Sequence, residues 1–458
     1  MCSFLLVSLN IDAILEEVTI RQRRKILEEM VRGKGLSEAY TATLRRLKAQ
    51  KGNKLILGQK VLMWVPHSER PLLVEELCHA MGVEMGSVEM DLENIPALRT
   101  LLASCLGLVT VEVSSSTVRL VHFTLKEHLS SDPTLFHNPH SEIADACLTY
   151  LNFEGVRDLS PHLDSPPSEM PLLEYASCFW GKHARRCATE NTKILALRLL
   201  DIFDERGSAR LLLLHHNKDR NPCPYFYRVS SGPTRFAGLH SVAFFGIAEI
   251  LTAVLDMKEW DVNTSDSAEC TALAWAAARG HEEVVRMLLE QDGVDPNKAD
   301  LVVRTPLSWA AECGHEQVVR VLLERENVDP NKFWLECGKT PLGLAARHGH
   351  QRIVEMLLER GDIDPSRVSR KYRRTPLSWA AVLGHEEIVK ILLKREDVDP
   401  NQAAGKYRRT PLSSAASCGH IGVVKVLLGR QDVDPNLTDS YDDRTPLLWA
   451  LEGGMRKW

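Results

Sequence analysis

The chain has 458 residues, of which 44 % are apolar and 26 % charged, a composition that is ordinary for a folded protein of two or three domains. Its formal net charge of −5 excludes an overall basic field, so any attraction to nucleic acid or to an anionic membrane has to be local. Apolar runs fall short of the roughly 18 residues that cross a bilayer, and the first ten residues lack the basic start of a signal peptide.

Cysteine usage indicates the compartment. Eleven cysteines are scattered along the chain without a Cys-x-x-Cys pair, which favours reduced thiols over a disulfide framework. We therefore expect an intracellular protein, with the cytoplasm favoured over the nucleus, and no membrane partner.

Residues 1–130 show helical periodicity and no repeat. Helical spacing or proline boundaries mark three segments: 20–47, 55–65 ending at Pro66, and 72–81 after Pro71. Segments 106–113 and 117–123 flank three serines and predict a two-stranded hairpin. Helices followed by a β-ribbon indicate a winged-helix layout. Residues 131–236 are expected to form a mostly helical connector that ends in a Pro/Gly-rich stretch at 221–233.

A phrase of the form Thr-Pro-Leu-x-Trp-Ala-Ala, with variations, then recurs at steps of 34 or 35 residues. Its threonines are Thr271, Thr305, Thr340, Thr375, Thr410 and Thr445. Threonine can cap a helix and proline suits the first helical position, while a glycine nine residues later can end that helix. A second amphipathic stretch and a Val-Asp-Pro-Asn turn follow. Stacked helix–turn–helix units are therefore predicted.

This phrase resembles the ankyrin repeat, whose signature Thr-Pro-Leu-His-x-Ala and Gly-His step are matched except at the first histidine. The resemblance implies a mainly α fold, with an ankyrin-repeat solenoid over 237–458 preceded by a helical and winged-helix region with one small hairpin. We expect a degenerate first copy at 237, full units from 271, 305, 340, 375 and 410, and an incomplete unit from 445.

The first half of the chain resembles the region that follows the nucleotide-binding core in fungal NACHT-type signalling ATPases with ankyrin tails. Four segments carry this resemblance: 36–44, 70–72, 118–129 and 171–183. It implies an NLR-like protein in which this region makes an intramolecular contact with an upstream nucleotide-binding core.

No enzymatic chemistry is predicted. The chain lacks the P-loop string Gly-x-x-x-x-Gly-Lys-Ser/Thr and the Gly-x-Ser-x-Gly elbow, and Gly33-Lys34-Gly35 has the wrong spacing for phosphate binding. We assign no catalytic, metal or cofactor residue, no cofactor and no small-molecule substrate. An active NTPase whose P-loop lies upstream of Met1 stays an alternative, as does truncation of the last unit.

Recurring aromatic residues and histidines are interpreted as scaffold. Five histidines follow the helix-ending glycines and are expected to bond helix ends within their own repeats: His281, His315, His350, His385 and His420. The tryptophans at 275, 309, 379 and 449 are expected in the core between repeats. His137 with His140, and Cys178, His183 and Cys187, lack the second close pair of a zinc site.

Nucleic-acid binding by the winged-helix region is a second alternative. Basic residues cluster over 45–60, but the expected recognition helix carries Glu75 and Glu76 and is nearly free of basic residues. Nucleic acid is therefore the disfavoured partner.

A basic residue precedes each Thr-Pro, and side chains at equivalent places in a solenoid form a stripe. Tyrosine and arginine, which binding hot spots favour, gather at the loop tips of the central units. The candidate partner-binding residues are Arg304, Lys339, Arg347, His348, Arg367, Arg370, Lys371, Tyr372, Arg373, Arg374, Lys406, Tyr407, Arg408, Arg409 and Arg444. We therefore predict a non-enzymatic protein–protein interaction module, the recognition or regulatory portion of a fungal NLR-like signalling protein, which binds an acidic protein surface through its concave face and loop tips.

Overall fold

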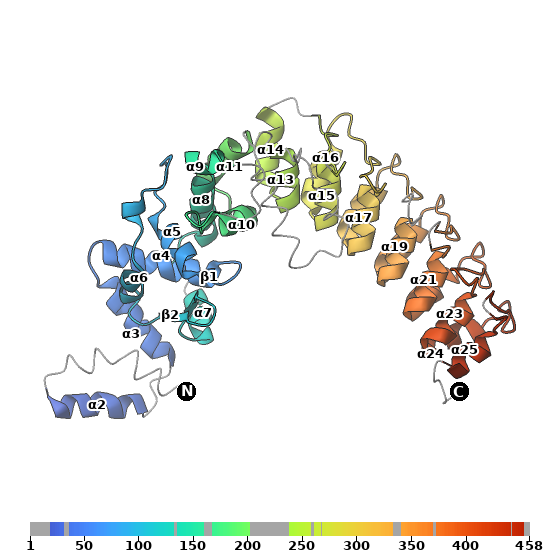
Figure 1. Cartoon of the computed structure of the whole chain (residues 1–458), viewed down its shortest axis with the longest axis horizontal. Helices are drawn as coiled ribbons and strands as arrows, with labels where there is room; N and C mark the ends of the chain where they lie inside the picture. Colours follow the sequence, from blue (N-terminus) through green and yellow to red (C-terminus); the bar gives the residue numbers. More distant parts are fainter. Residues whose placement is uncertain are drawn as a thin grey trace. The chain divides into compact units, whose positions relative to one another are not determined.

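The computed structural model describes residues 19–31, 36–131, 135–159, 167–201, 238–257, 261–266, 268–332, 340–369, 372–440 and 442–452. The chain forms two compact units, Met1–Cys223 and Pro224–Trp458 (Figure 1). Helices of the described residues are too short or too polar to span a membrane. The expected domain boundaries at 130/131 and 236/237 stay predictions.

The first unit is helical with one small sheet. Its helices are α2 (Ile20–Val31), α3 (Leu36–Lys48), α4 (Asn53–His67), α5 (Val74–Gly82), the 3-10 helix η1 (Leu92–Asn94), α6 (Leu98–Ser104), α7 (Phe123–Ser130), α8 (Pro139–Leu151), α9 (Glu154–Arg157), α10 (Leu173–Arg186) and α11 (Glu190–Asp201). Helices α8 and α10 pack against each other around the fully buried Cys147, Tyr175 and Trp180. The described part of the expected connector is thus helical.

Three antiparallel strands form the sheet in the order β1–β3–β2: β1 (Leu72–Leu73), β2 (Val109–Glu112) and β3 (Thr117–Leu120). The expected hairpin is confirmed with shorter strands. The prediction that a helix begins at Leu72 is wrong, because Leu72 and Leu73 pair with β3. Helix α5 begins at Val74, where the Glu76 carboxylate accepts the Leu73 backbone N–H at 2.7 Å as an N-terminal cap.

Helix α4 ends at His67, one residue beyond the expected end at Pro66, and Pro66 lies in its last turn. Two donors from the next residue hold that turn together. The Ser68 backbone N–H and the Ser68 hydroxyl both donate to the Trp64 carbonyl, at 2.9 and 2.7 Å. Pro66 has no backbone N–H to donate, and the two bonds from Ser68 satisfy a carbonyl of this last turn.

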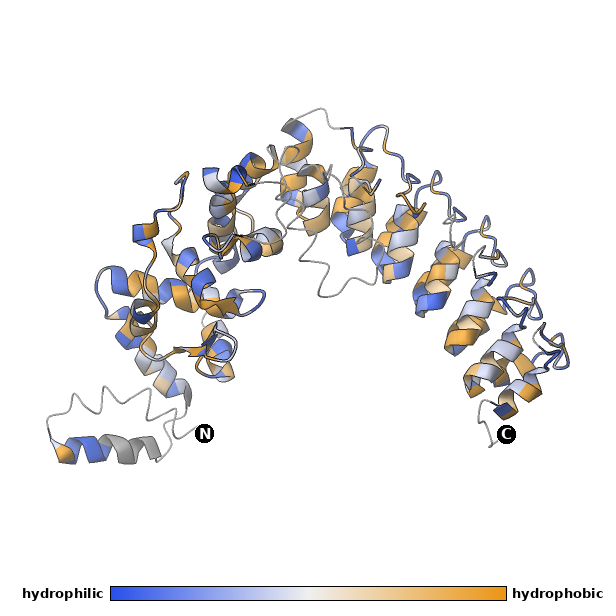
Figure 2. Cartoon of the chain, in the orientation of Figure 1, coloured by the Kyte–Doolittle hydropathy of each residue, from blue (hydrophilic) through white to orange (hydrophobic). Residues whose placement is uncertain are grey.

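The second unit stacks helix pairs in a regular array (Figure 1). Its helices are α13 (Gly238–Phe245), α14 (Ala248–Met257), α15 (Ala272–Arg279), α16 (Glu282–Leu289), α17 (Pro306–Cys313), α18 (Glu316–Leu323), α19 (Pro341–His348), α20 (Gln351–Leu358), α21 (Pro376–Leu383), α22 (Glu386–Leu392), α23 (Pro411–Cys418), α24 (Ile421–Leu428) and α25 (Pro446–Glu452). The degenerate first copy at 237 folds as the helix pair α13 and α14. Each helix pair packs on the next, and Figure 2 shows mostly hydrophilic loops beside helices that carry apolar faces.

The capping predictions are confirmed in the full units. The Thr305 hydroxyl accepts the Ser308 N–H at 3.2 Å, and Thr271, Thr340, Thr375 and Thr410 cap their helices in the same way. Gly314 ends α17 in the left-handed conformation with φ 82°. Each first helix therefore has about two turns, as the Thr-to-Gly spacing predicts.

The recurring histidines connect neighbouring repeats, so the expected bond within each repeat is wrong. The Nε2 atom of His315 lies 3.0 Å from the Ala278 carbonyl of the preceding unit, and that of His350 lies 3.1 Å from the Glu312 carbonyl. The same contact recurs at His281, His385 and His420. A carbonyl left open at the end of one helix is thereby satisfied by the following unit.

Asparagines of the Val-Asp-Pro-Asn turns form a second connection between units. The Asn297 amide donates to the Asn327 carbonyl at 2.6 Å, while its oxygen accepts the Asp329 N–H at 2.8 Å. Asn263, Asn331 and Asn401 repeat both contacts. Ser366 takes this place once and donates only to the Asp397 carbonyl at 2.9 Å.

Candidate partner-binding surface

A short hairpin precedes each first helix and projects a tip. In the hairpin before Thr305, the Asp300 N–H donates to the Arg304 carbonyl four residues later. In the hairpins before Thr375 and Thr410, the N–H groups of Ser369 and Ala404 donate to carbonyls five residues later. The extra residue explains why the 34-residue step lengthens to 35. In both kinds of hairpin the residue before the last one is left-handed, at Val303 (φ 63°) as at Arg373 (φ 50°) and Arg408 (φ 48°).

Neighbouring tips are joined through their backbones. The Gly405 N–H donates to the Arg373 carbonyl at 2.7 Å, and the Ser440 N–H donates to the Tyr407 carbonyl at 2.9 Å. Gly405 also lies against the Arg374 guanidinium, where an added Cβ would come within 3.4 Å of Cζ. The basic tips of the units at 375 and 410 are therefore held side by side.

The structure distributes the candidate residues over three environments. Those exposed are His348, Tyr372, Arg373, Lys406 and Arg408. Those half-buried are Arg347, Arg367, Arg374, Tyr407, Arg409 and Arg444. Arg304 is only 2 % exposed, so its guanidinium belongs to the interior. Lys339, Arg370 and Lys371 lie outside the described residues.

Arginines stack on the tryptophans of the first helices. The Arg304 Cζ lies 4.1 Å from the centre of the Trp309 ring. Trp379 has the Cζ atoms of two arginines near its ring, Arg347 of the preceding unit at 5.0 Å and Arg374 of its own unit at 5.3 Å. This cation–π packing holds the guanidinium groups in place on the first helices.

Trp449 repeats this arrangement with Arg409 at 3.7 Å and Arg444 at 4.9 Å. Trp275, Trp309 and Trp379 are buried, as expected for residues between repeats, whereas Trp449 is half-buried.

Three aspartates, which the sequence reasoning missed, orient these tryptophans. The indole N–H donates to Asp266 at 2.9 Å from Trp275, to Asp300 at 3.2 Å from Trp309, and to Asp439 at 2.8 Å from Trp449. Burial raises the pKa of Asp300 to about 6, although backbone N–H groups and Arg304 oppose that shift. The available signal was an Asp five or six residues before the capping threonine, which three of the four units with Trp carry.

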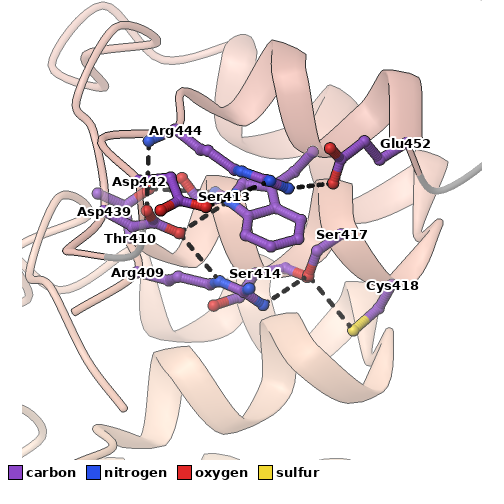
Figure 3. A network of polar contacts seen from close by, with 11 residues as sticks. Arg409, Thr410, Ser413, Ser414, Ser417, Cys418, Asp439, Asp442, Arg444 and Glu452 are labelled. Carbon is purple, nitrogen blue, oxygen red and sulfur yellow. Dashed lines mark hydrogen bonds and ion pairs between the residues drawn. The ribbon is translucent and has the colours of Figure 1, made fainter. Parts of the chain in front are cut away.

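Some of the candidate arginines form ion pairs with carboxylates of the array, and others do not. The Arg304 Nη1 lies 2.8 Å from Glu312 Oε2, eight residues along the chain. Arg444 pairs with Glu452 at the same spacing, while Arg409 contacts Asp439 at 3.2 Å and Ser417 at 3.4 Å (Figure 3). Among the described residues, no carboxylate lies within ion-pair distance of Arg347 or Arg374.

Comparison with known families identifies the second unit. The pattern described as "Ankyrin repeats (3 copies)" matches residues 208–300, 239–333, 297–369, 327–404 and 363–439, which together span 208–439 and more than half of the chain. The chain belongs to the ankyrin-repeat family. Ankyrin repeats indicate a protein–protein interaction module.

The winged-helix expectation is also confirmed. Residues 45–144 match the pattern described as "GPI inositol-deacylase, winged helix domain", which belongs to a NACHT-associated family. Among solved structures, the chain is similar to the ankyrin repeat domain of Bcl-3, a member of the IkappaB family. The identity is 24 %, the match covers 46 % of this chain and 92 % of that chain, and the TM-score is 0.42. The search of curated proteins gave no significant match.

Before the ankyrin array, the first unit holds a buried polar chain between α8 and α10. The Nδ1 atoms of His140 and His183 lie 2.8 Å apart, and His183 Nε2 lies 3.0 Å from the Tyr175 hydroxyl. Burial, with repulsion from nearby cations, lowers the pKa of His140 to about 4 and that of His183 to about 3. These neutral rings are consistent with a core hydrogen-bond network.

The structure also describes the residues that the sequence offered for metal binding and for nucleic-acid binding. The described residues contain no group of three or more His, Cys, Asp or Glu side chains arranged to hold a metal ion. In α5, the expected recognition helix, Glu76 is buried and pairs with Arg70 at 2.6 Å, while Glu75 is exposed. A partly acidic helix held in the winged-helix core is a poor match for the phosphate backbone of DNA.

Proposed function

We propose that the ankyrin array binds a protein partner with an acidic surface through the face that carries its first helices and through its hairpin tips. The observation that carries this proposal is the fixed pair of basic tips, in which exposed Arg373 and Arg408 are held together by the backbone bond from Gly405. Tyr372 and Lys406 lie on the same two tips. A rigid surface that combines tyrosine and arginine loses little entropy on binding.

We further propose that this module is the recognition or regulatory portion of a fungal NLR-like signalling protein, without catalysis of its own, acting in the cytoplasm. The match of residues 45–144 to a NACHT-associated winged-helix domain supports this assignment. In this arrangement the first unit contacts an upstream nucleotide-binding core, and partner binding on the array changes that contact.

The test is charge reversal at the tips. In the full chain, Arg373, Lys406 and Arg408 are changed together to Glu, and partners captured from host extract are compared quantitatively with those of the wild type. The matched control reverses three exposed basic residues of the second-helix side, Arg320, Arg325 and Lys425. We expect the tip variant to lose the specific partners and the control to retain them. An unchanged partner set for both variants would remove the proposed surface.

A further inference from the structure

One set of equivalent positions on the first helices holds different residues in the central ankyrin units than in the outer ones. It lies eight residues after the basic residue that precedes each capping threonine. We call it the eighth-position row, and its members are Glu312, Arg347, Val382, Ser417 and Glu452. At both ends of the row a glutamate pairs with the arginine of its own unit, Arg304 or Arg444. The three central units have no glutamate at this position.

In the central units Arg409 contacts Asp439, whereas Arg347 and Arg374 have no carboxylate of the described residues within ion-pair distance and keep their charge open. Arg374 is half-buried, donates to the Ser378 hydroxyl at 3.1 Å and stacks on Trp379, and Arg347 stacks on the same ring from the preceding unit. Burial lowers the pKa of Arg374, and repulsion from Arg409 acts in the same direction. A desolvated and positioned guanidinium forms stronger bonds to a carboxylate than one that is fully hydrated.

Other side chains around these arginines favour a polypeptide over a nucleic acid. Val382, in the middle of the row, is half-buried, and the next residue Leu383 is 42 % exposed, so the unit with Arg374 also presents apolar surface. The tyrosines are already engaged, because Tyr372 packs edge-on against Trp379 at 5.5 Å and Tyr407 has Lys406 and Arg409 near its ring. Base stacking, on which single-stranded nucleic-acid binding depends, would have to displace these contacts.

We propose that the three central units bind a polypeptide segment that alternates acidic and apolar residues. Its carboxylates bond Arg347 and Arg374, and an apolar side chain contacts Leu383. In the outer units Glu312 and Glu452 already pair with Arg304 and Arg444, so these arginines are not available to the same ligand. The segment is therefore confined to the centre of the array. This proposal rests on the proposed function, because it specifies the partner chemistry of that surface.

The structure supplies a variant that closes the central site in the same way as the outer ones. Val382→Glu places a glutamate at the row position where Glu452 pairs with Arg444, and the hairpins of both units have the same length. The matched control is Val382→Gln, which has nearly the same shape without the charge. Far-UV circular dichroism and urea unfolding confirm that both variants fold.

Binding is measured on the purified full chain by fluorescence anisotropy with a labelled eight-residue peptide of alternating Glu and Leu. A peptide of alternating Gln and Leu and a short duplex DNA are the comparison probes. We expect Val382→Glu to weaken binding of the Glu/Leu peptide about tenfold or more, the size of a lost charge-assisted bond, and Val382→Gln to change it less than about twofold.

Equal affinity of both Val382 variants for the Glu/Leu peptide would overturn the proposal. So would absence of binding to that peptide by the wild type, or binding of the duplex DNA at least as tight as that of the peptide. These outcomes are distinguishable from failure of the proposed function. A wrong segment chemistry leaves capture of host partners sensitive to the tip reversals, whereas a wrong function abolishes that sensitivity as well.

Discussion

Helix-ending glycines of the array pack against the histidine of the following unit, and this contact allows a quantitative prediction about stability. A Cβ added at Gly314 would lie 2.6 Å from Cε1 of His350, the histidine of the following unit. Gly314→Ala therefore has two consequences. Holding alanine at a φ of 82° costs about 1–2 kcal/mol. Displacing His350 also weakens its 3.1 Å hydrogen bond to the Glu312 carbonyl, which adds about 1 kcal/mol. We expect a total loss of about 2–3 kcal/mol in the free energy of unfolding.

The chain offers a matched control for the backbone part of this loss. Gly293 has a φ of 77°, and nothing lies within 4 Å of an added Cβ, so Gly293→Ala should show only the conformational cost of about 1–2 kcal/mol. All variants are measured by urea unfolding followed by far-UV circular dichroism. His350→Ala completes a double-mutant cycle, because removing the ring makes room for the Gly314→Ala methyl group. Equal losses for Gly314→Ala and Gly293→Ala, or strict additivity in the cycle, would refute the packing argument.

Three further predictions concern stability. Ser366→Asn should raise the free energy of unfolding by about 1 kcal/mol in urea, because asparagine can both donate to the Asp397 carbonyl and accept the Asp399 N–H as Asn297 does at its own junction; an unchanged midpoint would contradict this. Arg304→Met should cost about 3 kcal/mol, since it leaves a half-buried glutamate unpaired, whereas Arg444→Met should cost less than about 1 kcal/mol because Glu452 is exposed; comparable losses in urea unfolding would refute the difference in burial. In the first unit, the folded pKa values of His140 (about 4) and His183 (about 3) lie below the unfolded value of about 6.5, so the unfolded chain binds more protons in this range and stability should fall as the pH drops from 6.5 toward 4. The measurement is the urea midpoint for thiol labelling of buried Cys147 at several pH values, with His183→Gln expected to flatten the dependence.

Local chemistry explains which features of the array could be predicted from the sequence. Threonine caps and helix-ending glycines act over three or four residues, so Thr305 and Gly314 placed the ends of α17 correctly. The acceptor of His350 lies 38 residues away in the preceding unit, and no local pattern indicates which of two nearby helix ends it satisfies. In the first unit, two residues of β1 pair with β3 more than forty positions later, which local helical periodicity cannot predict.

The candidate surface was predictable in its residue types but not in its charge state. A basic residue before every Thr-Pro predicted a continuous stripe, yet the hairpin folds Arg304 back over the first helix, where Glu312 neutralises it. The eight-residue spacing was present in the sequence. Its meaning depends on a turn that brings the two residues together, and that turn is tertiary information.

Scaffold and recognition are therefore assigned to different positions of the same repeat. Positions that join units, such as His350, Asn297 and Gly314, stay nearly constant because each contact needs the same partner in the neighbouring unit. Among the described residues, no hydrogen bond or ion pair connects units through the side chains of Val382 or Ser417, so the row can vary without loss of such bonds. A unit that holds valine at that row, as the unit with Val382 does, gives its own arginine no carboxylate partner from this position. In such an array, specificity can be altered one charge at a time while the hydrogen bonds that connect the units remain unchanged.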